Sequence, residues 1–449
     1  MSALSTRGLL PVTKGETVNS TVYVPFMSDH VVAIRGALRH YDIACEVLPP
    51  PDDETLAIGL DLCRGRECLP CFLATGDIVR ACRNGTIDRA NSALLIPASP
   101  GPCRFGQYRI LQRTLLDREG FADVEILSPT SENSYRGFGK HPNALRLLVW
   151  EGIVAVDLLL KLRYEFRPYE LRKGATDEAY HRGLEWIEET VKDGGGSLLL
   201  QALDRIAADF AAIDVNRSTR RPVVAMLGEI YVMLNAHSNQ DLILQLEATG
   251  AEVVTGTLAE WLHFADETKI ERDALFGSWV GLLGTRALGA YKQRVERQMF
   301  ARLQHLLRHP ADPPMRDLFD MARPYFDPLL GTETLLTVAK VVDYAQHDVS
   351  GIVNVMPFSC MPGIVVSGIS ARMRRDFAQL PWLDVNFDGQ RITNIRTRLE
   401  AFVHQVTQFA RSRGRLEAEG NAYDSREMTR AAEEDDGESY FGVIIPQSP

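Results

Sequence analysis

The sequence predicts an α/β protein built from two Rossmann-like lobes with parallel sheets, joined by a helical bridge. Two observations support this fold class. Short apolar runs rich in β-branched residues alternate with stretches of helical periodicity, which is typical of βαβ units. The alternation occurs twice along the 449 residues, and a chain of this length usually forms two or three domains.

Each lobe is expected to contain four strands. Those of the first lobe are predicted at 21–26, 44–48, 93–97 and 123–127, and those of the second at 222–227, 252–254, 351–356 and 383–387. A helix is predicted over 106–118, where Leu111 and Leu115 recur at helical spacing before Gly120 ends the pattern.

The remaining helical segments define the domain organisation. The stretch 145–213 predicts a helical bridge broken at 167–168 and 194–196, and 258–309 predicts a helical insertion in the second lobe. We therefore divide the chain into five parts. These are an N-terminal extension (1–20), the first lobe (21–144), the bridge (145–220), the second lobe (221–415) and an acidic tail (416–449), which its composition predicts to be disordered.

Charge and hydropathy exclude several classes of partner. The 49 basic and 59 acidic residues give a net charge of -10, which argues against nucleic-acid binding. No apolar stretch approaches the ~20 residues needed to cross a bilayer, so we expect no membrane partner. The first 20 residues lack the apolar core of a secretory signal, which favours a cytoplasmic location.

Six of the seven cysteines fall between Cys45 and Cys103, which points to metal or redox chemistry in a cytoplasmic protein. The C-x4-C-x2-C spacing of Cys63, Cys68 and Cys71 resembles a plant-type 2Fe-2S loop. That match is imperfect, because bulky residues occupy positions where such loops carry small ones. Cys45, on a strand, and Cys82, at a helix end, are expected to be buried packing residues.

Two cysteines occupy matching places in the two lobes. Cys103 and Cys360 each follow the third predicted strand of a lobe, and the crevice beyond the carboxyl ends of parallel strands is where ligands bind. Cys68 begins a predicted helix, whose N-terminus favours a thiolate. Lobes that face each other would bring three thiolates from three loops to one iron–sulfur cube.

Two further residues are expected near this crevice. Glu229 ends the first strand of the second lobe, where it would donate protons or order a loop by accepting backbone N–H bonds. Arg104 would offset cluster charge or bind a phosphate or carboxylate, unless it is an ordinary surface arginine. For His30, a place near a helix N-terminus is favoured over a role as a metal ligand.

Several segments resemble the iron–sulfur component of the 2-hydroxyacyl-CoA dehydratase and benzoyl-CoA reductase family. The chain is most similar to the branch related to CoA-substrate-specific enzyme activases. The resemblance extends over roughly 22–408 in the family's order. It rests on the joint occurrence of three cysteine motifs, within the segments 24–30, 67–70, 75–77, 101–108, 228–231 and 357–363.

The resemblance implies an oxygen-sensitive 4Fe-4S cluster held by Cys68, Cys103 and Cys360, with the fourth iron open to a substrate. It also implies anaerobic electron transfer from a separate actin-like ATPase activase. This chain has no G-x-x-x-x-G-K-[ST] phosphate loop, so it would be the electron acceptor. The acceptor would pass a low-potential electron to an acyl-CoA thioester or other small substrate, as a dehydratase (lyase) or reductase, alone or with a homologous second subunit.

Two alternatives stay open at this point. Cys63 and Cys71 are additional to the family's three-cysteine pattern, and they would supply a fourth ligand, a larger double-cubane cluster, or only packing. In a different class of function, Cys63, Cys68, Cys71 and Cys103 would bind structural zinc in a non-catalytic protein whose lobes recognise a partner.

Overall fold

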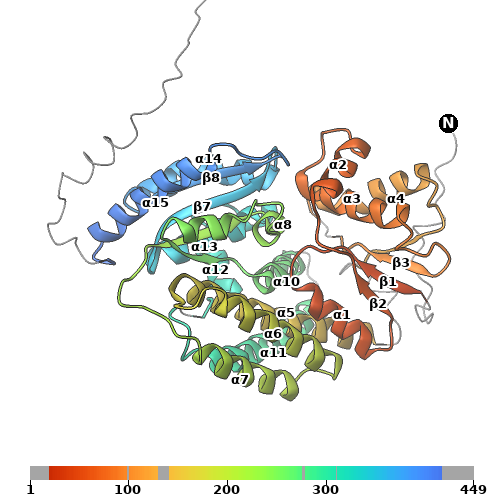
Figure 1. Ribbon diagram of the computed structural model, residues 1–449, viewed down its shortest axis with the longest axis horizontal. Helices are drawn as coiled ribbons and strands as arrows, with labels where there is room; N and C mark the ends of the chain where they lie inside the picture. The colour runs from red at the N-terminus through yellow and green to blue at the C-terminus, as the bar shows by residue number, and fades with distance from the viewer. Residues whose placement is uncertain (1–19, 99–100, 130–140, 276–278, 310, 417–449) are drawn as a thin grey trace, which may run out of the picture.

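The computed structural model describes residues 20–98, 101–129, 141–275, 279–309 and 311–416. It contains two four-stranded parallel sheets, one in each lobe, with a helical bridge packed beside both (Figure 1). The predicted fold class is therefore confirmed. Among the described residues, no helix is both long and apolar enough to cross a membrane.

The sheet of the first lobe has the strand order β2-β1-β3-β4. Its crossovers are helical, as parallel strands require. The strands are β1 (Thr21–Val24), β2 (Cys45–Val47), β3 (Ser92–Leu95) and β4 (Glu125–Leu127). The helices are α1 (Val31–His40), α2 (Asp53–Leu62), α3 (Leu69–Arg83) and α4 (Tyr108–Arg118), the last preceded by the 3-10 turn η2 (Arg104–Gln107).

The second lobe repeats this topology with the order β6-β5-β7-β8. Every residue of the central strand β7 is buried, because helices cover both faces of the sheet. The strands are β5 (Val223–Gly228), β6 (Glu252–Thr255), β7 (Val349–Pro357) and β8 (Trp382–Phe387). The helices are α8 (Ile230–Leu234), α9 (Leu242–Ala248), α13 (Thr334–Gln346), α14 (Met361–Asp376) and α15 (Ile395–Ser412). All eight predicted strands are present, with ends within two residues of the prediction.

The bridge and the insertion supply the other helices. The bridge consists of α5 (Pro142–Phe166), η3 (Arg167–Tyr169), α6 (Ala175–Lys192) and α7 (Ser197–Ala211). It is broken at 167–169 and 194–196, as predicted, and all three glycines of the second break have positive φ. The insertion consists of α10 (Leu258–Leu275), α11 (Trp279–Leu303), α12 (Met315–Ala322) and η4 (Pro328–Leu330). The extension 1–20 and the tail 416–449 lie outside the described residues, apart from residues 20 and 416.

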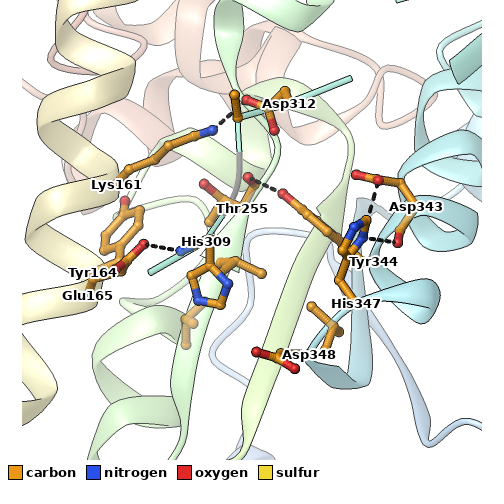
Figure 2. Close-up of a pocket in the computed structure, with 14 residues that line it drawn as sticks. Lys161, Tyr164, Glu165, Thr255, His309, Asp312, Asp343, Tyr344, His347 and Asp348 are labelled. Carbon is orange, nitrogen blue, oxygen red and sulfur yellow. Dashed lines mark hydrogen bonds and ion pairs between the residues drawn. The ribbon is translucent and has the colours of Figure 1, made fainter. Parts of the chain in front are cut away.

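A buried ion cluster joins the bridge, the insertion and the second lobe. Lys340 of α13 is 1% exposed, and its Nζ lies 2.8 Å from Glu260 Oε1 of α10 and 2.9 Å from Asp312 Oδ1. Asp343 Oδ2 lies 3.4 Å from the same ammonium. Lys161 of α5 also binds Asp312, beside a cavity (Figure 2). These buried charges therefore connect four segments of the chain, which are α5, α10, the loop that contains Asp312, and α13.

Candidate metal centre

The three predicted cluster cysteines each precede a helix as its N-cap residue. Cys68 caps α3, Cys103 caps η2 and Cys360 caps α14. Cys68 and Cys360 are buried, whereas Cys103 is half-buried. The backbone N–H groups of the following turn, like the helix dipole, oppose the rise in the pKa of each thiol that burial causes.

The structure brings these thiols into one electrostatic environment across the two lobes. Cys103 interacts with Cys68 within the first lobe and with Cys360 of the second. The topology explains this, because β3 and β7 occupy the same position in their sheets, next to β1 and β5. At the carboxyl ends of these strand pairs the strand order reverses, which is where ligands bind in parallel α/β sheets.

Arg104 links the three cysteine loops. Its Nη2 donates a hydrogen bond to the carbonyl oxygen of Ser359, 2.7 Å away in the second lobe. Its Nη1 donates to the carbonyl oxygen of Arg66, in the loop that leads to Cys68. Arg104 is exposed. Its contacts thus show a positioning role that the sequence did not predict, beside the predicted roles of offsetting charge and binding an anion.

Tyr108, the first residue of α4, is the closest polar neighbour of Cys68. Its hydroxyl lies 2.6 Å from the Cys68 sulfur, and the two groups share a hydrogen bond. Burial, followed by the adjacent thiols of Cys68 and Cys71, raises the pKa of Tyr108 well above its usual value. The tyrosine therefore stays protonated and can donate to a thiolate. Hydrogen bonds to ligating sulfurs are one means by which proteins tune iron–sulfur potentials.

Two carboxyl groups of the second lobe face the same crevice. Glu229 follows β5, and its Oε2 accepts a hydrogen bond from the backbone N–H of Val232 at 2.9 Å. It therefore orders the first turn of α8, which is one of the two predicted roles. Glu333 precedes α13, and its carboxyl group interacts with Trp261 and Cys103. Glu333 was not predicted, because no strand or recognisable motif precedes it.

Burial dominates the titration of these groups. It raises the pKa of Glu229 to about 8 and that of Glu333 to about 7, and repulsion from Glu333 adds to the shift of Glu229. Burial also raises the pKa of Cys103 to about 12, with Glu333 next in importance, and it raises the pKa values of Cys68 and Cys360. Without metal the site thus holds neutral thiols, so binding of a thiolate-ligated metal must release protons.

Cys63 and Cys71 are oriented differently from the three N-cap cysteines. Each thiol is the main influence on the pKa of the other, and both also interact with Thr75. The electrostatic partners of Cys103 and Cys360 are instead Cys68, Glu229 and Glu333, together with each other. Of this pair, Cys71 also interacts with Cys68.

His30 has the position that was predicted for it, as the N-cap residue of α1. Its ring nitrogens lie 2.9 Å from Ser28 Oγ and 2.9 Å from Asp157 Oδ1. The Asp157 carboxylate also accepts the backbone N–H groups of Leu258 and Ala259, at the start of α10. His30 is thus part of a buried polar network that joins the loop after β1 to the bridge and the insertion.

The donor set fits a thiolate-bound cluster. Three cysteines supply the soft thiolate ligands that iron–sulfur clusters bind. The helix N-termini that these cysteines cap offset part of the negative charge of the thiolates. Within the described residues, no group of three His, Cys, Asp or Glu side chains lies close enough to hold a single metal ion. Ligands of a cube bind different iron atoms, so their sulfurs lie farther apart than ligands of one ion.

Comparison with family models and curated proteins identifies no relative of this chain. No family model matches the chain, and no curated protein is significantly similar to it. The resemblance described above therefore stays a prediction.

We expect the metal-free protein to lose stability as the pH rises from about 5 to about 8. Glutamate in an unfolded chain has a pKa of ~4.3, so in this interval the folded state holds protons on Glu229 and Glu333 that the unfolded chain has released. The free energy of unfolding then falls with rising pH. Glu333→Gln should remove part of this decrease in the free energy of unfolding, because glutamine has no carboxyl group to ionise. We expect a stabilisation of about 1–2 kcal/mol at pH 8, a modest value because the Glu333 side chain is only half-buried.

Urea unfolding of metal-free protein at pH 5 and pH 8 measures this effect. Glu54→Gln is the matched control, because the Glu54 side chain is 71% exposed. A Glu333→Gln effect that is equal at both pH values would contradict the prediction.

Proposed function

We propose that this chain is an iron–sulfur protein that accepts a low-potential electron and passes it to a small substrate. Cys68, Cys103 and Cys360 would hold a 4Fe-4S cluster in the crevice between the lobes. The observation that carries the proposal is that three N-cap cysteines on three loops of two lobes, two of them buried and one half-buried, share one electrostatic environment. The sequence resemblance points to the same three residues.

When bound, such a cluster would supply one-electron chemistry and, at an iron without a protein ligand, a Lewis acid for a carbonyl or hydroxyl oxygen. The protein residues have separate tasks. Helix N-termini stabilise the negative charge of the thiolates, and Tyr108 donates a hydrogen bond to Cys68. Glu229 and Glu333 hold protons near neutral pH beside the thiols, which suits them to donate protons to a bound substrate.

The substrate class and the partners follow from the resemblance. We propose an acyl-CoA or other small thioester as substrate, and a separate actin-like ATPase as electron donor, in the cytoplasm. The reaction would be that of a dehydratase or a reductase, with or without a homologous second subunit. The proposed cluster is a single cube rather than a double cubane, because Cys63 and Cys71 interact mainly with each other.

Metal and sulfide analysis after anaerobic purification tests this proposal. About four iron and four labile sulfide per chain, in a brown protein that bleaches in air, is the result expected for one cube. A colourless protein with stoichiometric zinc and no sulfide would overturn the proposal in favour of a structural zinc site.

We further expect the chain to be inert toward ATP and to require a partner for reduction. The reason is that the sequence offers no phosphate-binding loop. Electron paramagnetic resonance should show a reduced cluster only when activase, reductant and ATP are all present under anaerobic conditions. Omitting ATP is the control. ATP hydrolysis by this chain alone, or reduction by a mild donor without ATP, would contradict the prediction.

A further inference from the structure

The α2–α3 hairpin packs backbone against backbone. A Cβ atom added to Gly59 would lie 2.0 Å from the carbonyl oxygen of Phe72, and one added to Gly76 would lie 1.9 Å from that of Thr55. Neither distance is possible for a real side chain, so both positions require glycine. The two glycines therefore fix the spacing of α2 and α3 at two points.

This close packing determines the positions of Cys63 and Cys71. Cys63 lies one turn after Gly59, with its backbone N–H donating to the Gly59 carbonyl at 2.9 Å, and Cys71 directly precedes Phe72. Cys63, the C-cap residue of α2, and Cys71, in the first turn of α3, therefore lie close together, and each thiol is the main influence on the pKa of the other. Cys63 is 6% exposed and adjoins the exposed residues 64–66, whereas Cys71 is completely buried.

We propose that Cys63 and Cys71 form a dithiol site that hydrogen peroxide converts to a disulfide. In the first step the Cys63 sulfur attacks one peroxide oxygen, which forms an S–O bond, breaks the O–O bond and releases water. The Cys71 sulfur then attacks the oxidised Cys63 sulfur, which forms the S–S bond and breaks the S–O bond, and the hydroxyl leaves with the Cys71 proton as the second water. Two thiols and one peroxide thus give one disulfide and two waters.

The surroundings of the other cysteines distinguish this pair. Cys45 packs in the core around α1 and α5, and Cys82 packs in the separate core between α3 and the first sheet. The Cys68 thiol already shares a hydrogen bond with Tyr108. A Cys63–Cys71 disulfide would close a short ring across the loop that carries Cys68 and leave the Cys68 thiol free. This inference goes beyond the proposed function and does not depend on iron.

Peptide mapping of the full-length, metal-free protein tests the proposal. The protein is treated with one equivalent of hydrogen peroxide, alkylated with N-ethylmaleimide in denaturant and digested with trypsin without reduction. Arg64 and Arg66 lie between the two cysteines, so the disulfide would hold the tryptic peptides 40–64 and 67–80 together. Fragmentation should place the link at Cys63 and Cys71, with Cys45 and Cys68 alkylated. The number of reactive thiols should fall from seven to five.

Three variants complete the experiment. Cys63→Ser and Cys71→Ser should each abolish the linked peptide, whereas Cys82→Ser should retain it and lower only the starting number of thiols. A link between Cys68 and Cys71, which both lie in peptide 67–80, would overturn the proposal. So would seven alkylated cysteines after peroxide treatment. Because the wild-type map decides between these results, a serine variant that folds poorly leaves the test valid.

Discussion

Cys360→Ser should remove most of the iron and sulfide from anaerobically purified protein, although Cys360 lies 257 residues after Cys103 (360 minus 103). The serine hydroxyl is close in size to the thiol, but oxygen is a much poorer ligand for iron–sulfur clusters than thiolate sulfur. Loss of one of three protein ligands would leave the cluster held by the first lobe alone. Iron and sulfide content per chain, measured beside wild type, gives the result.

Cys45→Ser is the matched control for this experiment. Cys45 is 2% exposed, yet it lies at the start of β2 in an apolar core, so its change should alter stability but not iron content. Full cluster occupancy in Cys360→Ser would show that the ligand set does not span both lobes. Equal iron loss in Cys45→Ser would show that the effect arises from misfolding.

Much of the fold could be predicted because a buried strand is recognisable in the sequence from its run of apolar and β-branched residues. The run at β7 consists almost entirely of apolar and β-branched residues, since both faces of this strand are covered. The breaks of the bridge were predictable for a similarly local reason, because Pro168 and the glycines at 194–196 cannot continue a helix.

The site was predictable only in part, because its residues reach the crevice in two ways. Cys103 and Cys360 follow corresponding strands, so topology alone places them together. Trp261 lies in the helical insertion and Glu333 lies just after it, so their positions beside Cys103 depend on how the insertion packs. The contact between Cys63 and Cys71 depends on the close approach of two helices at Gly59 and Gly76, which the cysteine spacing does not encode.

Lys340→Met should lower the free energy of unfolding by about 3–5 kcal/mol at pH 7, because removing one partner of a buried ion pair leaves the other uncompensated. Lys340 is 1% exposed and lies within 3.4 Å of three carboxylates. After the change, Glu260, Asp312 and Asp343 would share Lys161 as their remaining cation in the cluster. Urea unfolding measures the loss. Arg323→Met removes a cation whose side chain is 48% exposed, and it should cost at most ~1 kcal/mol.

The pH dependence of this loss separates an electrostatic cause from a packing defect. Burial opposes ionisation of Asp312, but Lys161 and Lys340 outweigh it and hold the pKa of Asp312 below its usual value. That contribution is present above the pKa of aspartate in an unfolded chain, ~3.9, and is lost as the pH falls through the lower folded value.

In Lys340→Met the carboxylates would take up protons more readily, so the deficit relative to wild type should shrink as the pH falls from 7 toward 4. Adding Glu260→Gln to Lys340→Met should restore part of the stability at pH 7 for the same reason. A deficit that stays constant with pH, and that Glu260→Gln does not reduce, would assign Lys340 to packing alone. Because Glu333 immediately precedes α13, the helix that carries Lys340, the charges that hold this helix in place also hold Glu333 beside Cys103.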